Sequence, residues 1–189
     1  MKSFISRKKH LFFFCVFLYA SECAALTGAR LADMFITNSQ GNLLVYLKVK
    51  NAFSRQIQQT VFSGVPTTFS FFIRVEQKRS LWTDKELAEA VLTHTIKYDN
   101  LKKEFSIRRS WEKGRNRIVR SPEEAERLMS DVEGYPILPM DKLEKGADYE
   151  IQAMAKLSKI SLPFYLRYLP VTPSIARFET EWYTIAFEY

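Results

Sequence analysis

The sequence predicts a mainly β protein: an antiparallel β-sandwich, immunoglobulin-like in architecture, with one or two short helices. Several stretches alternate apolar and polar residues at every second position, which is typical of strands with one buried face. The connections between these stretches are rich in Asn, Asp, Gly and Ser, residues that favour tight turns. No regular helix separates the alternating stretches, which argues for two packed antiparallel sheets.

The first 25 residues predict a signal peptide and take no part in the fold. Lys2, Arg7, Lys8 and Lys9 form a basic start, and the apolar run "LFFFCVFLYA" follows at residues 11–20. Small residues up to Ala25 then fit a cleavage site. A spanning helix needs roughly 20 apolar residues, so the run is short for a membrane anchor. We expect a periplasmic or secreted protein, with retention at the inner membrane by an uncleaved leader as the alternative.

Composition excludes several classes of function for the segment from residue 26 to residue 189, which we expect to form a single domain. Cys15 and Cys23 both precede the cleavage site, so the exported chain has no thiol for a disulfide or a metal site. His94 is then its only histidine, and we expect neither a metal nor another cofactor. Without the leader the net charge falls from +7 to +4, which does not suggest a nucleic-acid partner.

The strands and helices follow from local patterns. "LLVYLKVK" places Leu43, Val45, Leu47 and Val49 on one face, and "TTFSFFIRV" (67–75) alternates in the same way. Similar patterns occur at 104–111, 149–157 and 181–189, and "DKELAEAVL" is read as strand because it continues into the alternating "VLTHTIKY". Two helices are expected, at 51–64 and from Ser121 to Gly134, where Ser121 and Glu124 fit a capping box. "NSQGN" and "YDNLKK" predict hairpin turns.

These residues also resemble a known family. "NAFSRQI", "SGVPTTFSFFI", "LWTD", "HTIKYDNLKKEF" and "KGADYEIQAMAKL" resemble the uncharacterised bacterial family known as domain of unknown function 4390. The resemblance runs roughly from Leu31 to Tyr189. It implies an exported protein without an assigned activity or catalytic residues. It also implies, by genetic neighbourhood, a membrane sensor kinase of the nitrogen-regulation type as a partner.

Two segments are candidate binding surfaces. The tract "RRSWEKGRNRIVR" is strongly basic and could bind phosphate head groups at a membrane surface or an acidic protein face; the alternative is a solvated hairpin. The second segment, "SLPFYLRYLP", either covers one end of the sandwich or remains exposed as a docking patch. The candidate binding residues in the two segments are Arg108, Arg109, Trp111, Lys113, Arg115, Arg117, Arg120, Phe164, Tyr165 and Tyr168.

Catalysis is not expected from the sequence. His94 lacks a suitable acidic orienter, because Asp99 lies five residues along the same predicted strand and points to the opposite face. We therefore expect His94 to lie at the sheet surface or at the edge of the core. Three hypotheses remain: a binding or accessory module at the cell envelope, a carrier or sensor of an apolar ligand or lipid held between the sheets, and an enzyme. We favour the first.

Overall fold

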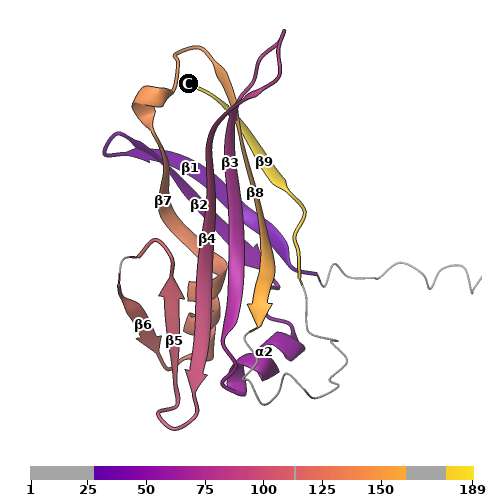
Figure 1. The fold of residues 1–189 in the computed structure, drawn as a ribbon, viewed down its shortest axis with the longest axis vertical. Helices are drawn as coiled ribbons and strands as arrows, with labels where there is room; N and C mark the ends of the chain where they lie inside the picture. Colours follow the sequence, from indigo (N-terminus) through magenta and orange to yellow (C-terminus); the bar gives the residue numbers. More distant parts are fainter. Residues whose placement is uncertain (1–27, 113, 161–177) are drawn as a thin grey trace, which may run out of the picture.

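The computed structural model describes residues 28–112, 114–160 and 178–189, so the proposed signal peptide lies outside the described residues. These residues form two antiparallel sheets (Figure 1). The small sheet has the order β1-β2-β7, with β1 (Arg30–Ser39), β2 (Asn42–Lys50) and β7 (Asp131–Pro139). The large sheet has the order β6-β5-β4-β3-β8-β9, with β3 (Thr67–Gln77), β4 (Lys85–Asp99), β5 (Glu104–Arg109), β6 (Asn116–Val119), β8 (Asp148–Ile160) and β9 (Tyr183–Glu188). The predicted antiparallel two-sheet sandwich is confirmed.

The core lies between the two sheets, where alternating apolar residues from both meet. Leu43, Val45, Leu47 and Val49 of β2 are buried, as their spacing predicts. The large sheet contributes inward side chains from β3 and β8: Phe69, Phe71, Ile73, Val75, Tyr149, Ile151, Ala153 and Ala155. In Figure 1, β1 and β2 of the small sheet run obliquely to the long strands β3 and β4. From Lys85 onward the segment "DKELAEAVL" belongs to the 15-residue strand β4, so its interpretation as strand is confirmed.

Two short helices and a 3-10 turn, η1 (Met140–Lys142), complete the described fold. Helix α2 (Arg55–Phe62) begins after Ser54, whose hydroxyl accepts the N–H of Ile57 at 3.4 Å. Helix α3 (Pro122–Ser130) begins after Ser121, whose hydroxyl accepts the N–H of Glu124 at 3.2 Å. Both caps satisfy backbone donors that a helix start leaves unpaired. No helix in the described ranges is long and apolar enough to span a bilayer.

The end of α3 differs from the sequence prediction. The predicted helix runs to Gly134, but α3 ends at Ser130 and β7 begins at Asp131, whose φ and ψ of −108° and 131° are extended. Val132, which fits the apolar stripe of a longer helix, is instead buried in β7 opposite Leu47 of β2. Pairing with β2 satisfies the backbone of this segment and completes the small sheet, which local periodicity does not reveal.

Gly134 forms a bulge in β7. Val132 pairs with Leu47 and Tyr135 pairs with Val45, so two residues of β7 lie opposite Tyr46 alone. Gly134 has a φ of +68°, and a Cβ atom there would lie 2.9 Å from the Tyr46 hydroxyl oxygen. A bulge with glycine in the left-handed region bends the strand locally. The glycine is therefore required by both its backbone angle and the close approach of Tyr46.

Replacing Gly134 with alanine is expected to lower the free energy of unfolding by about 1–3 kcal/mol, because the left-handed backbone strains a Cβ atom that also meets Tyr46. Gly146 provides the control, since its φ is +74° but nothing lies within 4 Å of its Cβ position. Urea denaturation should show a larger loss for Gly134→Ala than for Gly146→Ala. Equal losses would mean that the contact with Tyr46 is unimportant.

Hairpin turns join the strands as the sequence predicts. Between β1 and β2, Gln40 and Gly41 have φ values of 50° and 74°, the pair of positive angles that tight two-residue hairpins use. Between β4 and β5, the Asp99 carboxylate accepts the N–H groups of Leu101 and Lys102 at 2.9 and 3.0 Å. Each turn lies at the ends of the two strands that it joins.

Candidate binding surface

The basic tract at residues 108–120 forms a hairpin whose arginines divide between two faces. Arg108 pairs with Asn116 of β6 and with Thr95 of β4, and its side chain is exposed on the outer face of the large sheet. Arg109 follows directly and points inward, because successive strand residues face opposite sides. Neighbouring arginines therefore have different environments and different roles.

Arg109 is a structural residue in the interior and is only 2% exposed. Its Nε and Nη2 atoms donate to the carbonyl oxygen of Leu128, in the last turn of α3, at 3.1 and 2.9 Å. Its Nη1 atom donates to Oε1 of Glu112 at 3.2 Å and lies 3.7 Å from Oε2 of Glu133. A positive charge at the carbonyl end of a helix is favourable. Arg109 thus joins β5, α3 and β7.

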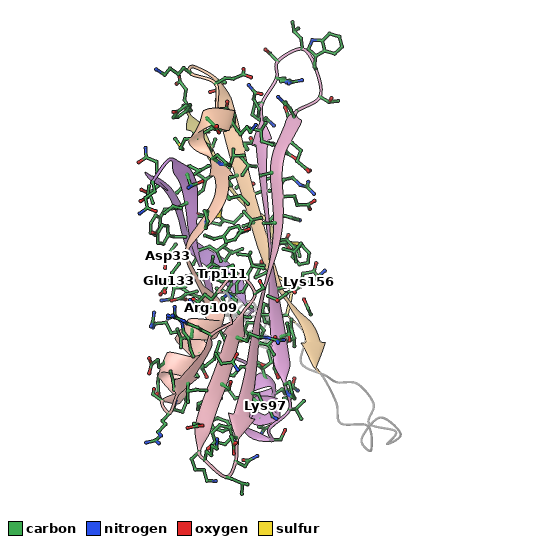
Figure 2. The ribbon with its side chains drawn as sticks, turned by 60° about the vertical axis from the view of Figure 1, so that its left-hand side comes forward. Asp33, Lys97, Arg109, Trp111, Glu133 and Lys156 are labelled. Atoms are coloured by element: carbon green, nitrogen blue, oxygen red, sulfur yellow. The ribbon has the colours of Figure 1, made fainter. Side chains whose placement is uncertain are left out.

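Trp111 packs against the same cluster. Its ring centroid lies 4.7 Å from that of His94 and 6.0 Å from that of Tyr135, and the Arg109 guanidinium carbon lies 5.7 Å from the Trp111 ring. Figure 2 shows Trp111 and Arg109 close together, with Lys156 on the other side of the large sheet. Trp111 is half-buried, so most of its contacts are within the fold.

His94 lies deeper in the protein than the sequence suggests. It is 0% exposed, at the centre of β4 opposite Arg109, rather than at the sheet surface or the edge of the core. Its Nδ1 atom lies 2.9 Å from the carbonyl oxygen of Met129 and must therefore donate a proton to it. Burial, followed by the charge of Arg109, lowers the pKa of His94 from 6.5 to about 3. His94 is thus neutral at physiological pH, and its described contacts are structural.

Arg117 is exposed but engaged with Glu112. Its Nε and Nη2 atoms donate to the two oxygens of Glu112 at 3.0 and 2.7 Å. Burial opposes ionisation of Glu112, but the hydrogen bond from Arg117 and the charge of Arg109 lower its pKa below the ordinary value. Glu112 therefore bridges Arg109 and Arg117, which leaves Arg117 less suited than Arg108 or Arg115 to bind another molecule.

A cleft of about 480 Å³ lies beside the β5–β6 hairpin. It is lined by Thr93, Arg108, Arg109, Ser110, Glu112, Gly114, Arg115 and Asn116. Arg108 and Arg115 are exposed, and neither forms an ion pair within residues 28–112, 114–160 and 178–189. The Glu112 carboxylate in the lining is engaged by Arg109 and Arg117, so the cleft presents the guanidinium groups of Arg108 and Arg115, which suit carboxylates or phosphates.

Arg108 and Thr93 of this cleft also belong to the outer face of the large sheet, which β3, β4, β5 and β8 share. Lys97 of β4 is exposed there, and Lys156 of β8 lies beside Ser70 of β3, with its Nζ atom 4.7 Å from the centroid of the Phe72 ring. We call Lys97, Arg108, Arg115 and Lys156 the basic outer face. Between these four cations lie five hydroxyl side chains: Thr68, Ser70, Thr93, Thr95 and Ser106. The alternation within β4, β5 and β8 could have indicated the outward positions of Lys97, Arg108 and Lys156 from the sequence.

Of the remaining predicted binding residues, the structure describes only Arg120. Arg120 is exposed directly after β6. Lys113, Phe164, Tyr165 and Tyr168 lie outside the described residues, so the proposed aromatic patch belongs to a segment about which the structure gives no information.

A second cleft, of about 440 Å³, lies between β2 and α3 and was not indicated by the sequence. It carries both signs of charge, and Lys48 lies 3.9 Å from Asp131 within it. Burial raises the pKa of Asp131, which the charge of Lys48 partly offsets. Its charges compensate one another, so this cleft offers less net attraction to a charged partner than the basic outer face.

The described residues offer little support for a metal site or for a ligand cavity between the sheets. Within the described residues, no group of three or more His, Cys, Asp or Glu side chains could hold a metal ion. An apolar recess between α2, α3, β4 and β5 has a volume of about 10 Å³, roughly the space of a single water molecule. The inward side chains of Phe69, Phe71 and Ile73 are 0% exposed, so they contact other side chains rather than an open cavity.

Comparison with known proteins identifies the family. No curated protein and no solved structure matches the chain. The model of the family described as "Domain of unknown function (DUF4390)" matches residues 27–186, which include all the strands and helices given above except the last residues of β9. The match confirms the resemblance seen in the sequence motifs. The chain belongs to the DUF4390 family.

Proposed function

We propose that this protein is a non-enzymatic accessory module of the cell envelope that binds an acidic protein surface through its basic outer face. The observation that carries the proposal is the grouping of Lys97, Arg108, Arg115 and Lys156 on one side of the large sheet. Arginine is enriched at protein interfaces and binds carboxylates through two parallel hydrogen bonds. The leader sequence supports a periplasmic or secreted location.

A membrane sensor kinase is the proposed partner, through its extracytoplasmic region. Support comes from the genetic neighbourhood that the family resemblance implies and from the charge of the face. Complementary charge steers partners together and selects against basic surfaces. An acidic patch on the extracytoplasmic region of the kinase would fit the basic outer face.

The alternative function, a carrier of an apolar ligand or lipid between the sheets, has less support. The inward aromatic residues contact one another closely, as Phe53 and Phe69 do at 5.2 Å between ring centroids. An enzymatic function is also less well supported, because His94 is neutral and donates to a backbone carbonyl.

Reversing two charges tests the proposal. We expect Arg108→Glu with Arg115→Glu to reduce recovery of a partner from cross-linked envelope fractions by about tenfold or more, because close interfacial charge pairs are worth 1.5 kcal/mol or more. Urea denaturation should be unchanged, since both side chains are exposed.

The control is Lys142→Glu with Lys145→Glu, which changes the net charge by the same amount at exposed positions elsewhere. If both double variants reduce recovery equally, only total charge matters and the proposal fails. Recovery of a co-purified lipid in place of a protein would favour the carrier function.

A further inference from the structure

The connection between β3 and β4 presents two of the most exposed apolar side chains in the described protein. Leu81 and Trp82 are 88% and 78% exposed. They lie in the middle of the segment that joins Gln77 to Lys85, and Figure 1 shows this hairpin projecting beyond the neighbouring strands at one end of the large sheet. Side chains exposed to this degree contribute almost no burial to the stability of the fold.

The base of this hairpin is closed by polar contacts. The Asp84 carboxylate pairs with the Lys78 ammonium group and accepts the N–H of Arg79 at 3.2 Å. Lys78 also lies 3.5 Å from a carboxylate oxygen of Glu150 on β8. These contacts tie the two legs of the loop to each other and to the sheet, so that residues 80–83 are held outward as a tip.

The charge of the tip is positive. Asp84 is compensated by Lys78, whereas Arg79 and Lys85 are exposed and form no ion pair within the described ranges. The apolar pair is therefore flanked on each side by a free cation. The tip thus combines apolar and aromatic side chains, which favour the membrane interface, with cations, which are attracted to anionic head groups.

A membrane fits this tip better than a protein pocket. The tip is a narrow convex projection, which a protein could accommodate only with a matching cavity, whereas a bilayer surface yields around it. Tryptophan prefers the head-group region of a bilayer, and lysine or arginine beside it attracts anionic lipids. We propose that Leu81 and Trp82 insert into the interfacial layer of an anionic phospholipid bilayer, with Arg79 and Lys85 at its head groups.

Such insertion would orient the protein on the membrane. Strand β4 has 15 residues, which span about 50 Å at 3.4 Å per residue, and the tip lies at its amino end. The long axis of the large sheet would then point away from the bilayer. This inference is separate from the proposed protein contact, which involves a different surface.

The opposite end of β4 supplies a matched control. Leu101, in the β4–β5 turn, is 95% exposed and is followed by Lys102 and Lys103, but no aromatic residue accompanies it in the turn. It resembles Leu81 in exposure and in neighbouring charge. A general affinity of basic, leucine-bearing turns for lipid would affect both sites, whereas the proposed contact affects only the Leu81–Trp82 tip.

The test uses the full chain and vesicles of phosphatidylglycerol and phosphatidylcholine with brominated acyl chains, which quench nearby tryptophan fluorescence. The three tryptophans are Trp82, Trp111 and Trp182, so the difference between wild type and Trp82→Phe isolates the tip. Residues 1–25 contain no tryptophan, and their own attachment to lipid would not produce this signal.

We expect quenching in the wild type that is lost in Trp82→Phe. Leu81→Ser should raise the half-saturating lipid concentration about tenfold, the effect of removing one buried aliphatic side chain, and Leu101→Ser should leave it unchanged. Added salt should weaken the binding, because screening reduces the attraction of Arg79 and Lys85 to anionic lipid. Equal quenching in wild type and Trp82→Phe, or equal effects of Leu81→Ser and Leu101→Ser, would overturn the proposal.

Discussion

Replacing Arg109 with methionine is expected to lower the free energy of unfolding by about 3–5 kcal/mol, the usual cost of removing one partner from a buried charged network. The Leu128 carbonyl oxygen would lose both guanidinium donors, and Glu112 would keep only Arg117. Because Leu128 belongs to the last turn of α3, the helix should also loosen. Urea denaturation gives the stability, and hydrogen exchange of the last turn of α3 reports the local effect.

Arg108 is the control for this prediction, since it is the neighbouring residue on the same strand but is exposed. Arg108→Met should change the free energy of unfolding by no more than about 0.5 kcal/mol. Similar values for the two variants would show that the inward hydrogen bonds of Arg109 contribute little.

The stability of the protein is expected to fall as the pH drops below about 6.5, partly because of His94. Its pKa is about 3 in the folded protein against an ordinary value of 6.5, so between these values the unfolded chain binds a proton that the folded chain does not. Protonation then favours unfolding, and the effect is absent above pH 7. At 1.36 kcal/mol for each pH unit, the loss reaches about 3 kcal/mol by pH 4.

A variant that cannot titrate isolates this contribution. His94→Gln retains an amide that can donate to Met129 but has no ionisable group. The acidic groups whose pKa values shift, such as Asp131 and Glu112, are present in both proteins. Subtracting the two curves of unfolding free energy against pH should give a line that is flat above pH 7 and falls below pH 6. Parallel curves over the whole range would contradict the burial of a neutral His94.

The sequence predicted a strand best where the residue pattern within that strand was sufficient by itself. Leu43, Val45, Leu47 and Val49 recur at every second position and are all buried, and the turn at Gln40 and Gly41 has residues suited to its positive φ angles. Strand β7 escaped detection because Val132 follows Met129 at a helical spacing, so periodicity alone continues α3. The decision there depends on pairing with β2, a contact between residues more than 80 positions apart.

The candidate site was predicted less well, because the charged residues were interpreted without considering which face of the strand each one occupies. Arg109 lies two residues from Ile107 and four from Phe105 on the same strand, so it shares their inward face. The density of charge in the tract nevertheless suggested a solvated surface. The buried Arg109 is stabilised by Glu112, three residues further along the same tract, and by Leu128 of α3 and Glu133 of β7. Only the fold could reveal the last two partners.

The proposed function requires the basic outer face to be a contact surface for another protein in the cell envelope. The most direct measurement is photo-cross-linking in intact cells, with a photoreactive amino acid in place of Arg115 and, in a parallel strain, in place of Lys142. We predict a protein adduct from position 115, with mass spectrometry identifying an envelope protein, and none from position 142. An absence of adducts from position 115, or the same adducts from both positions, would contradict the proposed function.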